Sequence, residues 1–285
     1  MKKSIFSAIA SASLAAMLLL SSCGTADSES KADSESKASA NAGSAVKDES
    51  YQKVADAGKL ILGLDASFKP MGYTDENDKI VGFDIDLAEE VCSRLGIKLE
   101  TYGVNWDTKE VDLDAGTIDC IWNGLSISPK RKEQMLMSDP YMKNDMVFTV
   151  NSDSGIKNLD ELKGKTIAVQ NGSTAQEILA ASDLFADITV NELATNVEAL
   201  NQLEMGMCDT VFLDSVVAKY EINATSKAFT ILEEGLEEEE YAIGFRKGDQ
   251  ALCDKIEEVL SEMKADGTVE KISTKWFGSD ITTIK

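Results

Sequence analysis

The sequence contains no histidine, and arginine is scarce: only Arg94, Arg131 and Arg246 occur, while the rest of its 28 basic residues are lysines. Without histidine, Ser-His-Asp and Cys-His catalysis and most zinc sites are excluded. Basic residues are also outnumbered by 50 acidic ones, which gives a formal net charge of −22. Such a surface repels nucleic acid and anionic lipid head groups, so neither is expected as a partner.

Cysteine is sparse and widely spaced. There are five cysteines and no Cys-x-x-Cys pair. Cys92 falls on the apolar stripe of an expected helix, and Cys120 lies inside an apolar run. We therefore expect Cys92, Cys120, Cys208 and Cys253 to be buried small hydrophobes, with a disulfide as the alternative. No metal or other cofactor is expected.

The first residues have the pattern of an export signal. Lys2 and Lys3 precede a mostly apolar run, residues 5–20, and Leu20-Ser21-Ser22-Cys23 follows. This ending resembles a bacterial lipobox, which implies a signal peptide over residues 1–22 and attachment of lipid such as palmitate to Cys23. An uncleaved membrane anchor and a plain secretory signal are the alternatives. No other stretch is long and apolar enough to span a bilayer.

Residues 23–50 have low complexity. The hexamer Ala-Asp-Ser-Glu-Ser-Lys occurs twice in tandem, at 26–31 and 32–37. The segment has almost no large apolar side chains, so nothing offsets the entropy lost on ordering it. We predict a flexible tether that holds a folded domain away from the membrane.

From residue 59 onward, strand-like and helix-like segments alternate. The first set has strands expected at 60–64, 97–102 and 117–122 with helices at 84–95 and 109–115. The second has strands at 165–169, 188–190, 209–213 and 241–246 with helices from 172, at 196–205 and at 249–264. Repeated β-α-β order predicts an α/β fold with mostly parallel sheets flanked by helices, and two such sets predict two lobes. Ligands in such folds bind at the carboxyl ends of strands.

The segment from Asn123 to Gln134 carries the clearest chemical signal. An apolar strand ends in Asn123-Gly124-Leu125-Ser126-Ile127-Ser128, and a rare arginine, Arg131, follows. A planar guanidinium beside hydroxyls can donate two parallel hydrogen bonds, which suits a small carboxylate. The alternative is a surface arginine at the start of a helix.

Several motifs together resemble the polar amino-acid substrate-binding proteins of bacterial ABC transporters. The motifs are Leu64–Pro70, Val81–Ala88, Ile127–Gln134 followed by Ser138–Tyr141, Ala168–Thr174, Ala242–Gly248 and Trp276–Gly278. The resemblance implies two lobes joined by two hinge crossovers near Tyr141–Asp145 and Glu238–Ala242. Lobe one would be residues 51–142 plus 242–285, and lobe two residues 143–241.

The family's contacts to the ligand backbone match residues of this sequence one by one. Arg131 matches the arginine that binds the α-carboxylate, and Ser126 matches the hydroxyl residue beside it. Gly124 would offer its carbonyl to the α-ammonium. Thr174 would add a hydroxyl and backbone N–H groups to the carboxylate. Asp214 matches the acid that pairs with the α-ammonium; its alternative role is a helix cap.

Other positions match contacts to the ligand side chain. Phe68 and Trp106 match the aromatic residues that sandwich it, although both could be core aromatics. Asp65, Asn123 and Gln170 match positions that contact its far end. Because these three are polar, a purely aliphatic ligand is disfavoured, and the charge of Asp65 disfavours glutamate and aspartate. Glutamine is the first expectation, a basic amino acid the second, and cystine a third.

We therefore expect a monomeric, lipid-anchored, extracytoplasmic binding protein of an amino-acid ABC importer that delivers its ligand to the permease and has no catalytic activity. The same fold could host dehydratase-like chemistry, or serve as a ligand-sensing domain of a receptor, and both remain alternatives. The acidic run Glu237–Glu240 is interpreted as a solvated charge cluster.

Overall fold

The computed structural model describes residues 47–182, 187–225, 227–234 and 237–285. Residues Val46–Lys285 group into one compact unit. The predicted signal peptide, the lipid-attachment residue Cys23 and nearly all of the predicted tether lie outside the described residues. Within the described part of the chain, no helix combines the length and the apolar character needed to cross a membrane.

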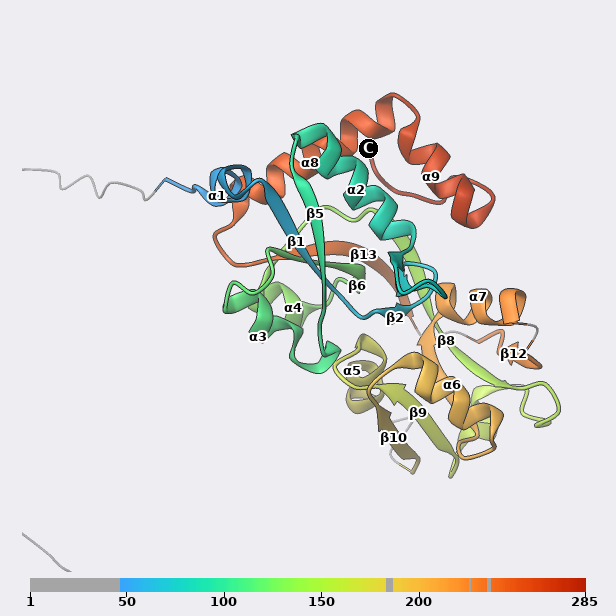
Figure 1. Cartoon of the computed structure of the whole chain (residues 1–285). Coiled ribbons are helices and arrows are strands. Elements are labelled where there is room, and N and C mark those ends of the chain that lie inside the picture. The colour runs from blue at the N-terminus through green and yellow to red at the C-terminus, as the bar shows by residue number, and fades with distance from the viewer. Residues whose placement is uncertain (1–46, 183–186, 226, 235–236) are drawn as a thin grey trace, which may run out of the picture. The chain divides into compact units, whose positions relative to one another are not determined.

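The core of the unit is one large sheet (Figure 1). Its strand order is β10 (Thr189–Leu193), β9 (Thr166–Gln170), β11 (Thr210–Asp214), β8 (Met142–Asn151), β13 (Glu237–Phe245), β6 (Cys120–Ser126), β1 (Lys59–Leu64) and β5 (Lys98–Gly103). The short strands β7 (Leu136–Met137) and β12 (Phe229–Ile231) pair with β13 and β8. A separate small sheet contains β2 (Ser67–Phe68), β3 (Gly72–Thr74) and β4 (Ile80–Val81).

Each half of the large sheet is parallel. In lobe one β1 pairs in parallel with β5 and β6, and in lobe two β9 pairs in parallel with β10 and β11. The antiparallel pairs involve β8 and β13, which lie between the two halves. Strand β6 is buried along its whole length, as expected for a strand covered on both faces. The predicted two-lobed α/β fold is thus confirmed.

The two long strands in the middle pair with each other where the lobes meet. Residues 237–241 of β13 lie opposite residues 146–142 of β8, and the predicted crossovers overlap this segment. The end of the chain runs alongside: Thr283 donates its backbone N–H to the carbonyl of Tyr141 at 2.8 Å and its hydroxyl to that of Pro140 at 2.9 Å. The exact lobe boundaries stay a prediction.

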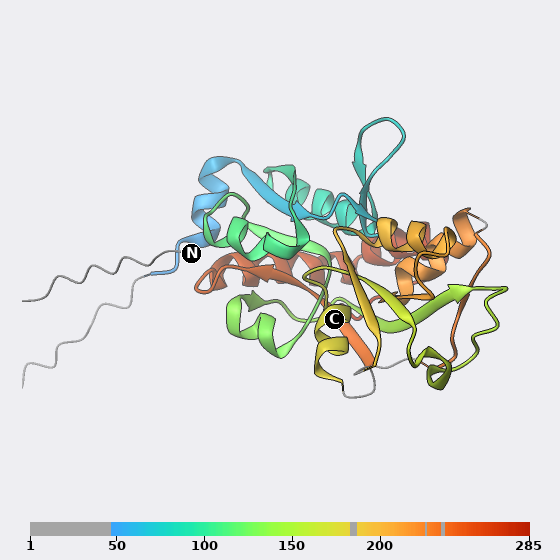
Figure 2. The ribbon, with the colours of Figure 1, turned by 90° about the horizontal axis from the view of Figure 1, so that it is seen from below.

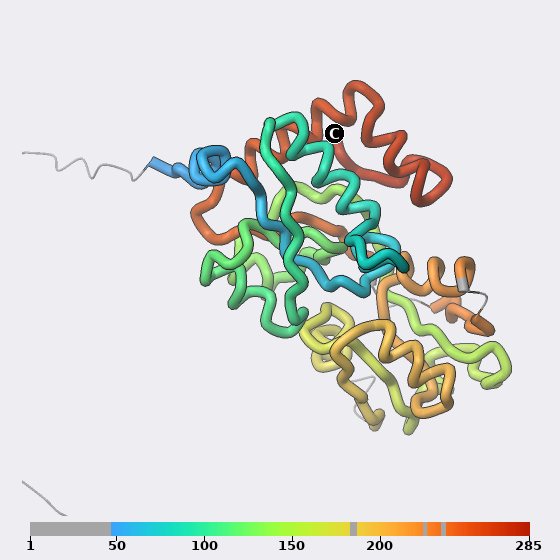
Figure 3. The backbone as a smooth tube through the Cα atoms, viewed as in Figure 1, coloured from blue at the N-terminus to red at the C-terminus, as the bar shows by residue number. Residues whose placement is uncertain are grey.

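The helices cover the faces of the two halves. Lobe one has α1 (Ser50–Ala57), α2 (Phe83–Leu95), α3 (Lys109–Asp114), α4 (Pro129–Gln134), α8 (Gln250–Ala265), α9 (Thr268–Phe277) and the 3-10 turn η1 (Trp106–Thr108). Lobe two has α5 (Thr174–Ala181), α6 (Asn196–Glu204), α7 (Ser215–Thr225) and the turn η2 (Leu159–Leu162). Helix α8 packs on both α1 and α2, so the blue start and the red end of the described chain meet in lobe one (Figures 2 and 3).

Helix α2 illustrates how the sequence determines the buried face and the end of a helix. It buries the stripe of Leu87, Ala88, Val91 and Cys92 against the core, and it ends at Gly96, which adopts the left-handed conformation (φ 69°). Cys92, Cys120, Cys208 and Cys253 are all free and buried, as expected of small hydrophobes.

Some strands of the structure differ from the prediction or were not predicted. The strand expected at 117–122 begins only at Cys120, after the left-handed turn at Gly116. Strand β8 was not among the expected elements, and only its first residues fall in a predicted crossover. There buried Met142 and Asn144 alternate with exposed Lys143 and Asp145.

Candidate ligand-binding site

The predicted site residues come from strand ends in both lobes. Asp65 directly follows β1, Ser126 ends β6, Gln170 ends β9 and Asp214 ends β11. Each of these strands belongs to a parallel pair, so the carboxyl ends in one lobe face those in the other. The fold therefore places at one edge the residues that the sequence separates widely.

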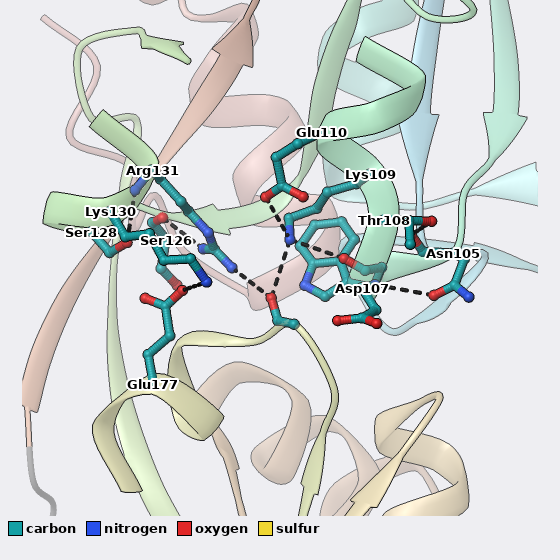
Figure 4. A network of polar contacts seen from close by, with 12 residues as sticks. Asn105, Asp107, Thr108, Lys109, Glu110, Ser126, Ser128, Lys130, Arg131 and Glu177 are labelled. Atoms are coloured by element: carbon teal, nitrogen blue, oxygen red, sulfur yellow. Dashed lines mark hydrogen bonds and ion pairs between the residues drawn. The ribbon is translucent and has the colours of Figure 1, made fainter. Parts of the chain in front are cut away.

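Arg131 is buried, and the alternative of a surface arginine is wrong. It lies in α4, whose N-cap residue Ser128 accepts a hydrogen bond from the Arg131 backbone N–H. Only 2% of the residue is exposed. Its guanidinium donates to the carbonyl of Ser126 at 2.7 Å and to that of Gly172, in lobe two, at 3.3 Å (Figure 4). Burial lowers the pKa of Arg131, and surrounding acids oppose this shift.

Asp214 is the buried anion of the site. Its carboxylate accepts hydrogen bonds from the Tyr241 hydroxyl at 2.5 Å and from the Asn144 side chain at 2.9 Å. Burial, and second the charge of Glu239, raise the pKa of Asp214 to about 7, while the charge of Arg131 acts in the opposite direction. A cationic partner next to Asp214 would favour its ionised form.

Ser126, Thr174 and Glu239 form a polar cluster beside Arg131. The Ser126 hydroxyl donates to the Glu239 carboxylate at 2.6 Å, and Thr174 Oγ1 lies 3.5 Å from Ser126 Oγ. Glu239 is buried, with 8% exposure, whereas Glu238 and Glu240 are exposed. The interpretation of the acidic run as a solvated cluster is therefore wrong for Glu239. In a strand, Glu239 faces the same side as Tyr241, and that alternation was the missed signal.

Asp65 and Gln170 connect the lobes directly. The Gln170 amide donates to Asp65 Oδ2 at 2.7 Å, and the other carboxylate oxygen accepts from the backbone and hydroxyl of Ser67. Asn123 accepts a hydrogen bond from the Asp65 backbone N–H at 3.0 Å, and the Asn196 amide donates to Gln170 at 3.1 Å. The three polar residues predicted to contact the far end of the ligand side chain thus lie in one buried network.

The two predicted aromatics are buried in different apolar clusters. Phe68 is 4% exposed and lies against Gly124, where a Cβ would come 2.7 Å from its ring. Trp106 is 6% exposed and packs with Leu113 and Ile118. Their contact with a ligand side chain stays a prediction.

Gly124 requires glycine. It has φ 58°, and its backbone N–H donates to the buried carboxylate of Asp84 at 2.8 Å. Asp84 also accepts from the Tyr141 hydroxyl at 3.0 Å. Burial raises the pKa of Asp84 to about 7. Asp84 therefore fixes the backbone at the position predicted to contact the ligand, a role that the sequence motif did not reveal.

Lys109 was also missed. Its ammonium donates to the carbonyls of Trp106 at 2.9 Å and Gly172 at 3.1 Å and pairs with Glu110 at 3.0 Å. The residue is 1% exposed, an unusual environment for lysine. One signal was available: a lysine at the start of a helix, where a cation is disfavoured, suggests a tertiary partner.

A pocket of about 480 Å³ opens beside the polar cluster of Ser126, Thr174 and Glu239. Its polar lining residues are Ser128, Thr174, Glu177, Ser182, Glu238 and Glu239. Among the described residues, no group of three His, Cys, Asp or Glu side chains could hold a metal ion. The side chains of the site can contact a ligand through hydrogen bonds and charge.

The chain belongs to the bacterial extracellular solute-binding proteins, family 3, whose model matches residues 60–279. The match spans both lobes and all of the site residues described above. The chain is therefore a solute-binding protein and not an enzyme.

Individual relatives agree with this assignment. The L-cystine-binding protein TcyJ of Escherichia coli (strain K12) is 29% identical over 248 residues, which are 85% of this chain and 92% of TcyJ. The arginine-binding extracellular protein ArtP of Bacillus subtilis (strain 168) is 33% identical over 224 residues, 77% of this chain and 86% of ArtP. The crystal structure of Tv2483 bound to L-arginine has a TM-score of 0.81 and 32% identity, covering 84% of this chain and 98% of that one.

Proposed function

We propose that this protein binds a polar or basic L-amino acid between its two lobes and delivers it to the permease of an ABC importer. The observation that carries the proposal is a pair of buried opposite charges without ion partners. Among the ion pairs of the described residues, neither Arg131 nor Asp214 takes part.

A zwitterion satisfies both charges at once. Its carboxylate would receive two hydrogen bonds from Arg131, with the Thr174 hydroxyl beside it, and its ammonium would lie at Asp214. A buried charge is costly unless it is paired, so bringing both charges into one closed site favours a ligand that carries both signs. Because α5 belongs to lobe two and α4 to lobe one, such a ligand would also hold the lobes together.

The side-chain end of the site favours a cationic or amide ligand. Asp65 is buried, and among the described residues it has hydrogen-bond donors but no ion-pair partner. A guanidinium or ammonium would supply the missing charge. We therefore rank a basic amino acid ahead of glutamine, with cystine next. The names of the relatives ArtP and TcyJ are consistent with this ranking.

A thermal-shift screen of the full chain in mild detergent, freed of co-purified ligand by unfolding and refolding, tests the proposal. Each standard amino acid and cystine is added at about 100-fold excess over a trial Kd, which should raise the stability by about 2.7 kcal/mol for a true ligand. Calorimetry then ranks arginine, lysine, glutamine and cystine. Absence of a shift with every amino acid would refute the proposed function.

We also propose that Cys23 carries the lipid that anchors the protein outside the cytoplasm. The lipobox-like Leu20-Ser21-Ser22-Cys23 supports this. Mass spectrometry of the mature N-terminus should find an acylated Cys23, and Cys23→Ala should release the protein from the membrane fraction. An unmodified Cys23 in the mature protein would contradict the anchor.

A further inference from the structure

Two cations of lobe one meet at one backbone carbonyl of lobe two. The Gly172 carbonyl accepts hydrogen bonds from Lys109 at 3.1 Å and from Arg131 at 3.3 Å. Figure 4 shows the side chains of Lys109 and Arg131 converging from α3 and α4. The carbonyl belongs to the turn between β9 and α5, and Thr174 begins α5 two residues later.

This turn approaches lobe one so closely that only glycine fits at position 172. Gly172 has φ 68°, and a Cβ on it would lie 2.6 Å from the Asp107 Cα and 2.9 Å from the Trp106 carbonyl oxygen. The approach is therefore backbone against backbone. A contact of this kind exists only when the lobes are closed.

The Lys109 ammonium has no donor left over once this contact is made. Its three donor protons match three acceptors, namely the carbonyls of Trp106 and Gly172 and the carboxylate of Glu110. It also lies 4.8 Å from the centre of the Trp106 ring. Arg131, by contrast, needs to turn its donors to the ligand carboxylate in the proposed function.

We propose that Lys109 is a positioning residue for the closed state: it holds the Gly172 turn, and with it the start of α5, against lobe one and so slows release of the ligand. The proposal rests on the proposed function, since Arg131 and Thr174 are the ligand contacts that this turn aligns. When the carboxylate occupies Arg131, Lys109 keeps the Gly172 carbonyl in place.

The test measures ligand release in the full chain by stopped-flow displacement, together with calorimetric affinity, for the amino acid that the screen selects. Lys109→Met keeps the apolar length and removes the ammonium. Because a lost hydrogen bond from a buried charge weakens the closed state, release should accelerate on the order of tenfold or more.

Lys130→Met is the matched control. Lys130 also reaches across to lobe two, where it pairs with Glu177 at 3.1 Å, but its side chain is 63% exposed. An exposed pair contributes little, so its removal should change the release rate less than about threefold. Gly172→Ala, which blocks the approach itself, should weaken binding at least as much as Lys109→Met.

The two rate constants of binding separate positioning from a general loss of structure. In Lys109→Met the dissociation rate constant should rise while the association rate constant stays close to that of the wild type, because the contact with Gly172 is made between the lobes. A variant that had lost its fold would lose association as well.

The outcomes are distinct. Faster release with an unchanged association rate in Lys109→Met, and little change of either rate in Lys130→Met, support the proposal. Unchanged release in Lys109→Met, or equal effects of both lysine variants, would overturn it while leaving amino-acid binding intact. If the wild-type protein binds no amino acid, the proposed function itself fails.

Discussion

Arg131 and Asp214 are buried charged side chains whose hydrogen-bond partners are neutral groups. Arg131 is oriented by the Ser126 carbonyl, and Asp214 by the hydroxyl of Tyr241 and the amide of Asn144. These neutral partners hold the two charges in place without neutralising them. The pair therefore stays available to a ligand with complementary charges.

Replacing Arg131 by alanine should reduce the affinity for the amino acid by about 2–5 kcal/mol, because the buried carboxylate of the ligand loses its partner. Calorimetry at constant ionic strength measures the change. Arg94→Ala serves as the control, because Arg94 pairs with Glu90 and Asp266 far along the sequence from the site. Equal affinity of wild type and Arg131→Ala would contradict the assigned role.

The two buried acids Asp84 and Asp214 make the stability depend on pH. Burial raises the pKa of both to about 7, against about 3.9 in an unfolded chain. Between these values the folded protein binds more protons than the unfolded one, so the free energy of unfolding falls as the pH rises. The Tm of the ligand-free protein should therefore decrease from pH 5 to pH 8.

Asp84→Asn isolates one of the two groups. It cannot ionise, so the slope of Tm against pH should become about half as steep over the same range. Acids with lowered pKa values do not interfere; the pKa of Asp266, for example, is lowered to about 2 by its hydrogen bond with Arg94. A slope identical to that of the wild type would show that Asp84 does not titrate in this range.

At the scale of elements, the start of α2 depends on one glycine. Gly82 has φ 150°, and a Cβ at this position would lie 2.1 Å from the Met71 carbonyl oxygen. Gly82→Ala should therefore destabilise the protein by about 3–5 kcal/mol, from backbone strain and the clash together. Urea unfolding measures the change.

Gly116→Ala is the matched control for this effect. Gly116 also has a left-handed φ, 75°, but a Cβ there would meet nothing within 4 Å. Gly116→Ala should lower the free energy of unfolding by only about 1 kcal/mol. Equal losses in the two variants would contradict the clash at Gly82.

The sequence predicted those elements whose apolar residues follow a simple period. Helix α2 was recognisable from its apolar stripe, and β6 from its apolar beginning, Cys120–Trp122. Strand β8 was not expected as an element, although Met146–Val150 are buried.

The site residues were likewise predicted only in part. Arg131 and Ser126 could be proposed because they stand in the segment Asn123–Gln134, and Asp214 because it matches the acid of the family that the sequence resembles. Lys109 and Glu239 were missed, although a cation at a helix start and the alternation of a strand were available as signals. Both signals are weak, because they indicate burial of a charged side chain without identifying its partner, such as Gly172 for Lys109 and Ser126 for Glu239.

At the scale of the whole molecule, the four described cysteines are separate buried thiols. Burial raises the pKa of Cys92 to about 12 and that of Cys208 to about 11, so the reactive thiolate is scarce. Ellman's reagent should therefore react with none of these four thiols in the native protein and with all four after denaturation. Rapid reaction under native conditions would contradict the burial of these thiols.

The segment at Thr282 and Thr283 has a practical consequence. It adds hydrogen bonds at Tyr141 and Pro140, where one crossover strand begins. A tag or reporter attached next to Thr283 would therefore lie beside the predicted crossover at Tyr141–Asp145. Fusions made ahead of α1 avoid this, and fluorescent sensors that report hinge movement could instead exploit it.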